Sequence, residues 1–115
     1  MKIITKRIDE MERATYNPRI DLMPEDEEFQ YLEESMRRFG QVLPVVWNQR
    51  TNRVVSGHQR LSVLEYWGEE KAEVSVVDLD ETKEKQLNLA LNKITGSWDN
   101  EKLRSVLKEL GDDAL

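Results

Sequence analysis

The sequence contains no cysteine and a single histidine, His58, and these two shortages exclude several kinds of chemistry. Without cysteine there is no disulfide framework, no thiolate nucleophile and no zinc site built on cysteine ligands. One histidine cannot supply a multi-histidine metal site, and any Ser-His-Asp triad would have to use His58. We therefore expect no resident metal.

Long apolar runs are also missing. No segment approaches the ~20 consecutive apolar residues that a membrane span needs, and no positively charged stretch followed by an apolar one indicates a signal peptide. The 115 residues fit one domain, 1–115, because globular domains cluster near ~100–150 residues. We expect a cytoplasmic protein with no membrane partner, a core over about residues 16–95 and a helical tail over 99–110.

Acidic residues are unevenly distributed. The chain carries 23 Asp and Glu against 17 Lys and Arg, a net charge of −6, which argues against coating of DNA by bulk electrostatics. Between residues 35 and 64, however, there is no acid, and the cations are all arginines: Arg37, Arg38, Arg50, Arg53 and Arg60. Arginine offers a planar fork of donors that suits phosphate. The segregation indicates an anion site, with a chance cluster on a solvated face as the alternative.

The pattern of apolar residues, prolines and glycines predicts an α+β fold: a small mixed sheet with packed helices and a two-helix C-terminal tail. Pro24 followed by four acids predicts the start of a helix that ends at Gly40. Those acids, residues 25–28, could be a metal site, but in a first helical turn they more often complement the helix dipole. The other expected segments are strands at 2–8, 43–47, 53–55 and 73–79, and helices at 57–68, 87–94 and 103–110. The helix at 87–94 would bury Leu87, Ala90, Leu91 and Ile94.

The segment from Val54 to Arg60 is the most suggestive of chemistry, because a strand turns at a glycine directly into a helix. A helix N-terminus presents unpaired N–H groups and a partial positive charge, so it binds anions. Gly57 would let the backbone approach a phosphate, Ser56 would cap the helix or donate to a phosphate oxygen, and Arg60 would fold back onto the same anion. The alternative is an ordinary strand–helix junction with Ser56 as its cap.

Several short motifs follow one another along the chain in a specific order. They are Asn17-Pro18-Arg19, the helix that ends at Gly40, Pro44 opening a strand, Gly57-x-x-Arg60 opening a helix, and the stretch from Leu89 to Asp99. Together they resemble the ParB/sulfiredoxin-like superfamily, and above all the ParB N-terminal domain. The last stretch is similar to ParB-like domains fused to phage and bacterial DNA-modification methylases.

This resemblance implies a fold that binds a nucleoside triphosphate, CTP or ATP, and that acts as a partner-loading regulatory module in DNA segregation or modification. The residues that we expect at the nucleotide are Arg19, Pro44, Ser56, Gly57, His58, Gln59, Arg60 and Asn92. DNA would be bound only through another domain or a partner, since the tail is too acidic to follow a DNA backbone. The sequence leaves the oligomeric state open, with a homodimer as one option.

The chain departs from the family pattern at the positions that matter for catalysis. His58 and Gln59 replace the Glu and first Arg of the glycine box, and Leu91 replaces the acid before the motif asparagine, Asn92. Leu91 cannot hold Mg²⁺, so we expect weak or no metal-dependent nucleotide hydrolysis and little role for Mg²⁺. Sulfiredoxin has its catalytic cysteine where His58 stands, which excludes that activity.

His58 is the one catalytic candidate. A lone histidine is usually a surface or locally bonded residue, but next to a phosphate site it could donate to the phosphate or accept a proton from a substrate hydroxyl. The alternative function is therefore a small phosphotransferase or nuclease, for which acids such as Asp78 or Asp80 would have to reach the basic segment. Three tryptophans could stack a base, the second of them more typical of a core position: Trp47, Trp67 and Trp98.

Overall fold

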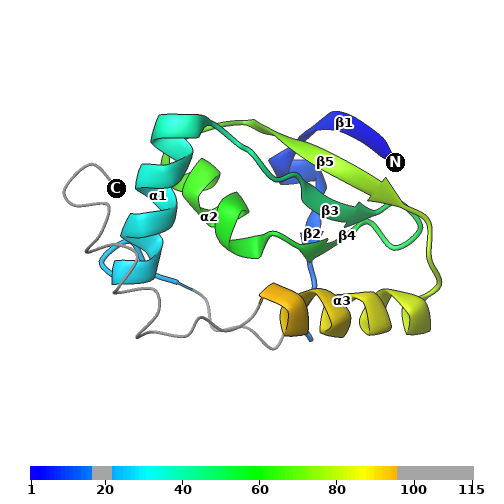
Figure 1. The fold of residues 1–115 in the computed structure, drawn as a ribbon. Helices are drawn as coiled ribbons and strands as arrows, with labels where there is room; N and C mark the ends of the chain where they lie inside the picture. The colour runs from blue at the N-terminus through cyan, green and yellow to red at the C-terminus, as the bar shows by residue number, and fades with distance from the viewer. Residues whose placement is uncertain (17–21, 96–115) are drawn as a thin grey trace.

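A computed structural model describes residues 1–16 and 22–95, with the side chains of 92–95 left out. This part of the chain forms a mixed five-stranded sheet with three α-helices (Figure 1). The predicted α+β class is confirmed. The predicted helix at 103–110, the remainder of the tail, Arg19 and Trp98 lie outside the described residues.

The strands follow the order β1-β5-β3-β4-β2 across the sheet. Their bounds are β1 Lys2–Arg7, β2 Glu12–Arg13, β3 Val45–Asn48, β4 Arg53–Ser56 and β5 Lys71–Val77. β1 runs antiparallel to β5, β5 parallel to β3, β3 antiparallel to β4, and β4 parallel to β2. Both edge strands therefore come from residues that precede Tyr16, and the short strand β2 was not expected from the sequence.

The first helix, α1, spans Glu27–Phe39 and does not begin at Pro24 as the sequence suggests. Its N-cap is Asp26, in an extended conformation, and the Asp26 carboxylate accepts a hydrogen bond from the backbone N–H of Met23. Pro24 therefore lies in the turn before the helix, not in its first turn. Glu27 and Glu28 still occupy the first turn, where acids complement the helix dipole.

Helices cover both faces of the sheet. α2 (His58–Tyr66) packs against α1, and residues of both helices join one face of the sheet in the main core, with Phe29, Leu61 and Val54 buried there. Consecutive strand residues point to opposite faces, yet Val55 is as buried as Val54. The second face is covered by α3 (Glu81–Thr95), which contacts β4 and runs beneath it in Figure 1.

The buried face of α3 is polar, which corrects the predicted pattern. Ala90 is exposed, and Leu87 and Leu91 are only half-buried. Over residues 81–91, the part of α3 whose side chains are described, the buried residues are Glu84 and Asn88, 0% and 1% exposed. The predicted core residue Ile94 lies outside that part. The apolar periodicity identified the helix correctly and its buried face wrongly, because polar side chains with partners across the fold take the inner positions.

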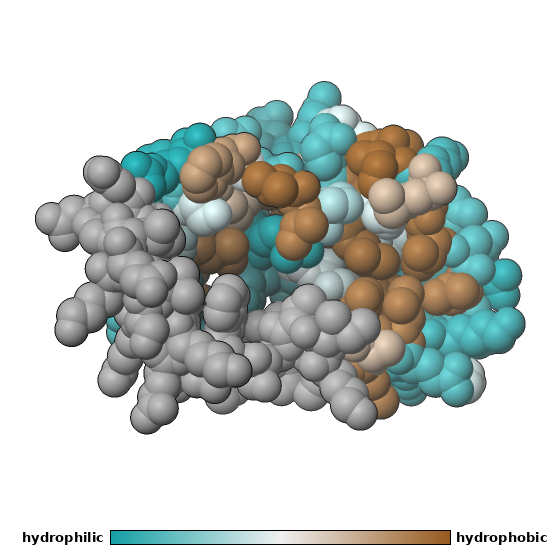
Figure 2. All heavy atoms as spheres, viewed as in Figure 1, coloured by the Kyte–Doolittle hydropathy of each residue, from teal (hydrophilic) through white to brown (hydrophobic). Residues whose placement is uncertain are grey.

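Apolar side chains also remain on the surface. Phe39, Val42 and Leu43, around the turn between α1 and β3, are each more than half exposed. Figure 2 shows such residues as separate brown areas on a face that also carries hydrophilic groups. None of the described helices is both long and apolar enough to cross a membrane.

Candidate functional site

The turn between β4 and α2 is built on a glycine in the left-handed region. β4 ends at Ser56, and Gly57 is the N-cap of α2 with φ 93° and ψ 21°, in the left-handed region. No side chain caps the helix, so Ser56 does not act as the cap that the sequence allowed. The first turn of α2 carries no acidic residue. The N–H groups at the start of α2 therefore have no acidic side chain from their own turn beside them.

Gly57 lies so close to its neighbours that no side chain would fit. A Cβ built on it would lie 3.1 Å from the Cα of Val45, 3.2 Å from Val45 Cγ2 and 2.9 Å from Arg60 Nη2. Val45 is the first residue of β3 and is fully buried. Glycine is therefore required at position 57 both for its φ and for the close approach of two backbones.

Arg60 joins this turn to the strand beside it. Its Nη2 donates to the backbone carbonyl of Pro44 at 3.0 Å. Of the residues expected at the nucleotide, the structure thus brings together Pro44, directly before β3, Gly57, directly after β4, and Arg60 in the first turn of α2. The guanidinium is thus oriented by a neutral backbone carbonyl.

His58 is buried, with 8% of its surface exposed. The sequence allowed two ordinary roles for a lone histidine, a surface residue or a locally bonded one, and the first is wrong. Its backbone carbonyl accepts hydrogen bonds from Arg13 Nη1 at 3.1 Å and from Ser62 Oγ at 3.0 Å. These bonds anchor the first turn of α2 to β2 and to the next turn of the helix. Gln59 and Ser56 are half-buried and flank the same turn.

The arginines of the acid-free segment do not form a common basic surface. Arg50 Nε donates to Asp78 at 2.8 Å, and these bonds, with one from Gln49, lower the pKa of Asp78 below its ordinary value. Arg53 Nη1 pairs with Glu81 and Glu84, each at 3.3 Å. Arg37 pairs with two glutamates of its own helix, Glu33 and Glu34. The charge segregation along the sequence is therefore largely cancelled in space, and Arg60 is the member of the set that lies at the Gly57 turn.

The acids after β5 reach the basic segment at the end opposite to Gly57. Asp78 and Glu81 meet Arg50 and Arg53, and Arg53 is at the start of β4 whereas Ser56 is at its end. Among the described residues, no group of three or more His, Cys, Asp and Glu side chains is arranged to hold a metal ion.

Two of the tryptophans have contacts of their own. Trp47 donates its indole N–H to Asn52 at 3.0 Å, and Lys6 Nζ lies 4.4 Å from the ring centroid, a cation–π contact that covers one face. Trp67 packs against the core and donates to Glu33 at 2.9 Å, as expected of a core position.

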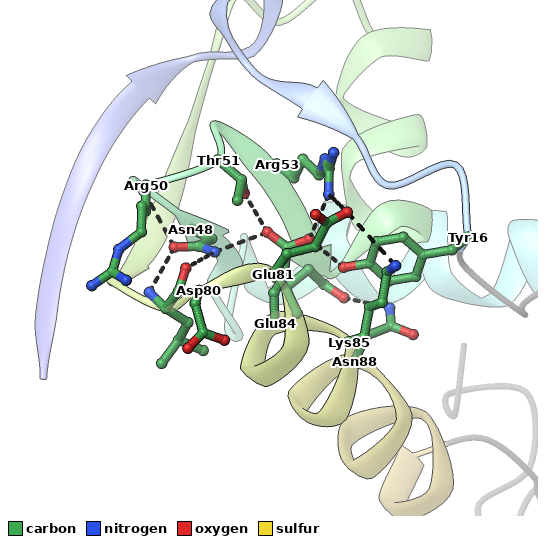
Figure 3. A network of polar contacts seen from close by, with 12 residues as sticks. Tyr16, Asn48, Arg50, Thr51, Arg53, Asp80, Glu81, Glu84, Lys85 and Asn88 are labelled. Carbon is green, nitrogen blue, oxygen red and sulfur yellow. Dashed lines mark hydrogen bonds and ion pairs between the residues drawn. The ribbon is translucent and has the colours of Figure 1, made fainter.

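A network of polar side chains around Glu84 is the main feature that sequence reasoning missed (Figure 3). The carboxylate accepts hydrogen bonds from four side chains: Tyr16, Asn48, Thr51 and Arg53. Burial alone would raise the pKa of Glu84, but these four bonds outweigh it and lower the pKa below its ordinary value. A glutamate and an asparagine four residues apart, Glu84 and Asn88, were the only sequence signal, and such a pair is ordinary on an exposed helix face.

A pocket of about 530 Å³ lies elsewhere, between α2 and the start of the chain. Leu61 and Glu65 line it from α2, and Arg7 and Arg13 from the first strands. Arg13 is paired with Glu65, and Arg7 with Asp9 and Glu70. Since these cations already have carboxylate partners, we assign no anion to this pocket.

Comparison with known proteins identifies a family match over most of the chain. Residues 2–93 match the family model of the ParB N-terminal domain. The chain belongs to the ParB N-terminal domain family. The match includes every strand and all of α3 except its last two residues, and it contains Pro44, Gly57, Arg60 and Asn92. A search of curated protein sequences finds no match.

Solved structures share the fold at low sequence identity. The C-terminally truncated chromosome-partitioning protein ParB from Caulobacter crescentus, complexed with CTP-gamma-S, superposes with a TM-score of 0.71 and 17% identity, covering 86% of this chain and 57% of that one. The same protein complexed to the centromeric parS site gives a TM-score of 0.53 and 18% identity, covering 69% and 41%. Sulfiredoxin from Arabidopsis thaliana gives a TM-score of 0.60 and 15% identity, covering 77% and 98%.

The ParB/sulfiredoxin-like fold is therefore established for this chain. The chain spans 57% and 41% of the two ParB chains, and nearly the whole of the sulfiredoxin. Most described members of the expected nucleotide set are consecutive in the chain, from Ser56 to Arg60, and Pro44 is hydrogen-bonded to Arg60. Asn92 lies on α3, which packs against β4.

Proposed function

We propose that this domain binds a nucleoside triphosphate, with CTP as the first candidate and ATP as the second, at the turn from Ser56 to Arg60. The observation that carries the proposal is Gly57: a left-handed N-cap, packed against Val45, at the start of a helix whose first turn has no acid. Membership of the ParB N-terminal domain family supports the same site, and a ParB of this fold was solved with CTP-gamma-S.

The residues at the turn fit a phosphate group. The N–H groups at the start of α2 would donate to phosphate oxygens, aided by the positive end of the helix dipole. Arg60, oriented by the Pro44 carbonyl, would supply a charged donor, and Ser56 and Gln59 further neutral ones. His58 would contribute its backbone N–H, because its buried ring lies within the domain. Arg19 and Asn92 complete the proposed set.

We assign the domain a regulatory or partner role and not catalysis. A bound triphosphate supplies negative charge and a base whose presence can be read by a partner, a second copy of the chain or another domain. Hydrolysis would further need a metal held by carboxylates and a group that orients water. Leu91 stands where the family motif has its acid, and the carboxylates after β5 meet Arg50 and Arg53 at the other end of β4. DNA would be reached through another domain or a partner.

Calorimetric titration of the purified domain with CTP, ATP and GTP, with and without Mg²⁺, tests this proposal. Arg60→Ala should weaken binding of the preferred triphosphate, while Arg50→Ala, a matched loss of an arginine whose partner is Asp78, should leave it unchanged. Saturable binding that Arg60→Ala abolishes supports the site. Equal affinities of the two variants, or no binding of any triphosphate, would refute it.

A further inference from the structure

Glu84 is a fully buried carboxylate whose partners come from three separate parts of the chain (Figure 3). Oε1 accepts hydrogen bonds from Thr51 Oγ1 and from Asn48 Nδ2 at 2.8 Å. Oε2 accepts from the Tyr16 hydroxyl and from Arg53 Nη1 at 3.3 Å. The glutamate thus connects α3 to the β3–β4 hairpin and to the end of the first described stretch.

Stability alone does not account for a charge at this position. Removing a carboxylate from water carries a large desolvation penalty, and well-packed apolar residues often stabilise a fold as much as a buried ion pair does. Several partners of Glu84 also have other bonds or access to water: Arg53 pairs with Glu81, and Asn48 Nδ2 also donates to the Leu79 carbonyl. What four directed bonds add is a defined position of one element on another.

Two hydrogen bonds from neighbouring turns of α3 define its register along β4. Glu84 meets Arg53, and Asn88, one helical turn later, donates its Nδ2 to the Val55 carbonyl at 2.9 Å. Four helical residues advance about 6 Å, and two strand residues advance about 6.6 Å. If the same spacing continues, position 92 of α3 is the next to lie beside this strand, opposite Gly57, which directly follows β4.

The same carboxylate binds the residue that leads into the Asn-Pro-Arg motif. Tyr16 precedes Arg19 by three positions in the sequence, and its hydroxyl bond to Glu84 links that part of the chain to α3. One buried side chain on the helix that carries Asn92 is therefore bonded to the residue directly before the Asn-Pro-Arg motif.

We propose that Glu84, assisted by Asn88, is a positioning residue of the nucleotide site. It sets the register of α3 along β4 and ties the segment that leads to Arg19 to the same helix, so that nucleotide affinity depends on it although it does not touch the ligand. This inference rests on the proposed function of the Gly57 turn.

Tyr16→Phe is the sharpest perturbation, because it removes one bond to Glu84 and keeps the ring. Tyr31→Phe is its control for the loss of a tyrosine hydroxyl bond, since Tyr31 donates to Glu27, four positions before it on α1. With calorimetry well below the melting temperature, Tyr16→Phe should weaken CTP binding about tenfold, a typical size for coupling between two sites, and Tyr31→Phe should leave it unchanged. A loss of stability alone would not change the affinity there, because nearly all molecules stay folded.

A second measurement does not depend on the ligand. Amide hydrogen exchange of the free protein should be faster over Leu89–Leu91 and at Gly57 in Tyr16→Phe and in Glu84→Gln than in Tyr31→Phe. If wild-type protein binds no triphosphate, the proposed function fails and this exchange pattern still decides the register role. Wild-type CTP affinity in Tyr16→Phe, or exchange rates at these amides equal to those of Tyr31→Phe, would overturn the inference and leave the proposed function standing.

Discussion

Replacing Gly57 by alanine separates two contributions that this glycine makes. Alanine at φ 93° is strained, and a non-glycine residue in the left-handed region costs about 1–2 kcal/mol. The new Cβ would also lie 2.9 Å from Arg60 Nη2 and 3.1 Å from Val45 Cα. Arg60 can move by losing its bond to the Pro44 carbonyl, worth about 1 kcal/mol, but the Val45 backbone is paired with β5 in the sheet and cannot. We expect a total loss of about 2–4 kcal/mol, the sum of these contributions with modest overpacking.

Two other glycines provide the control. Gly40 and Gly68 have φ of 75° and 78°, and an added Cβ would meet nothing within 4 Å at either. Alanine there should therefore cost only the backbone strain, about 1–2 kcal/mol. The free energy of unfolding of each variant, measured by urea denaturation, gives the comparison. If Gly57→Ala is no more destabilising than Gly40→Ala and Gly68→Ala, the close approach of the turn to β3 is not as described.

Further outcomes can be checked on the same preparations. Arg60→Ala should weaken triphosphate binding by about 1.5–3 kcal/mol, the scale of a charge-assisted hydrogen bond, and Arg60→Lys should not restore it, because an ammonium lacks the planar fork; full rescue by lysine in titrations would contradict this. Because Glu84 has a pKa below its ordinary value in the folded state, the unfolded chain binds its proton more readily. Stability should therefore fall as the pH drops below about 4.5, the ordinary value, and Glu84→Gln should reduce this fall in urea titrations at pH 6.5 and about 3.5. Phosphate release from CTP should be slow and nearly the same in EDTA and in Mg²⁺; robust release that EDTA abolishes would favour the phosphotransferase or nuclease alternative.

The local part of the site was predictable from sequence, and the long-range part was not. A strand followed by Gly57 and a helix is a signal within seven residues, and the turn, the helix and the strand before it all form as expected. The partners of the arginines are another matter. Arg50 and Arg53 find carboxylates about thirty positions later in the chain, Asp78 and Glu81, so a segment without acids says little about its charge in the fold.

The buried polar side of α3 could not be predicted for a related reason, because its partners are distant in the sequence. Sequence periodicity assigns buried positions by apolarity, whereas Glu84 and Asn88 are buried because donors and acceptors from the sheet meet them. Nothing local to α3 distinguishes such a glutamate from a solvated one. The start of α1 shows that one residue does not determine where a helix begins. Pro24 favours a first helical turn, but the N-cap is Asp26, two positions later.

The order of the strands bears on how the chain folds as it is synthesised. The first strand to leave the ribosome is β1, but Lys2 pairs with Val76 and Arg7 with Lys71, so its partner is made about seventy residues later. β2 likewise waits for Arg53 and Val54. At ~5–20 residues per second, the first strands spend several seconds without partners, and the contacts that close the sheet are distant in sequence, which slows folding. The domain should therefore fold late and in one cooperative step, after β5 has emerged, and not strand by strand from its N-terminus.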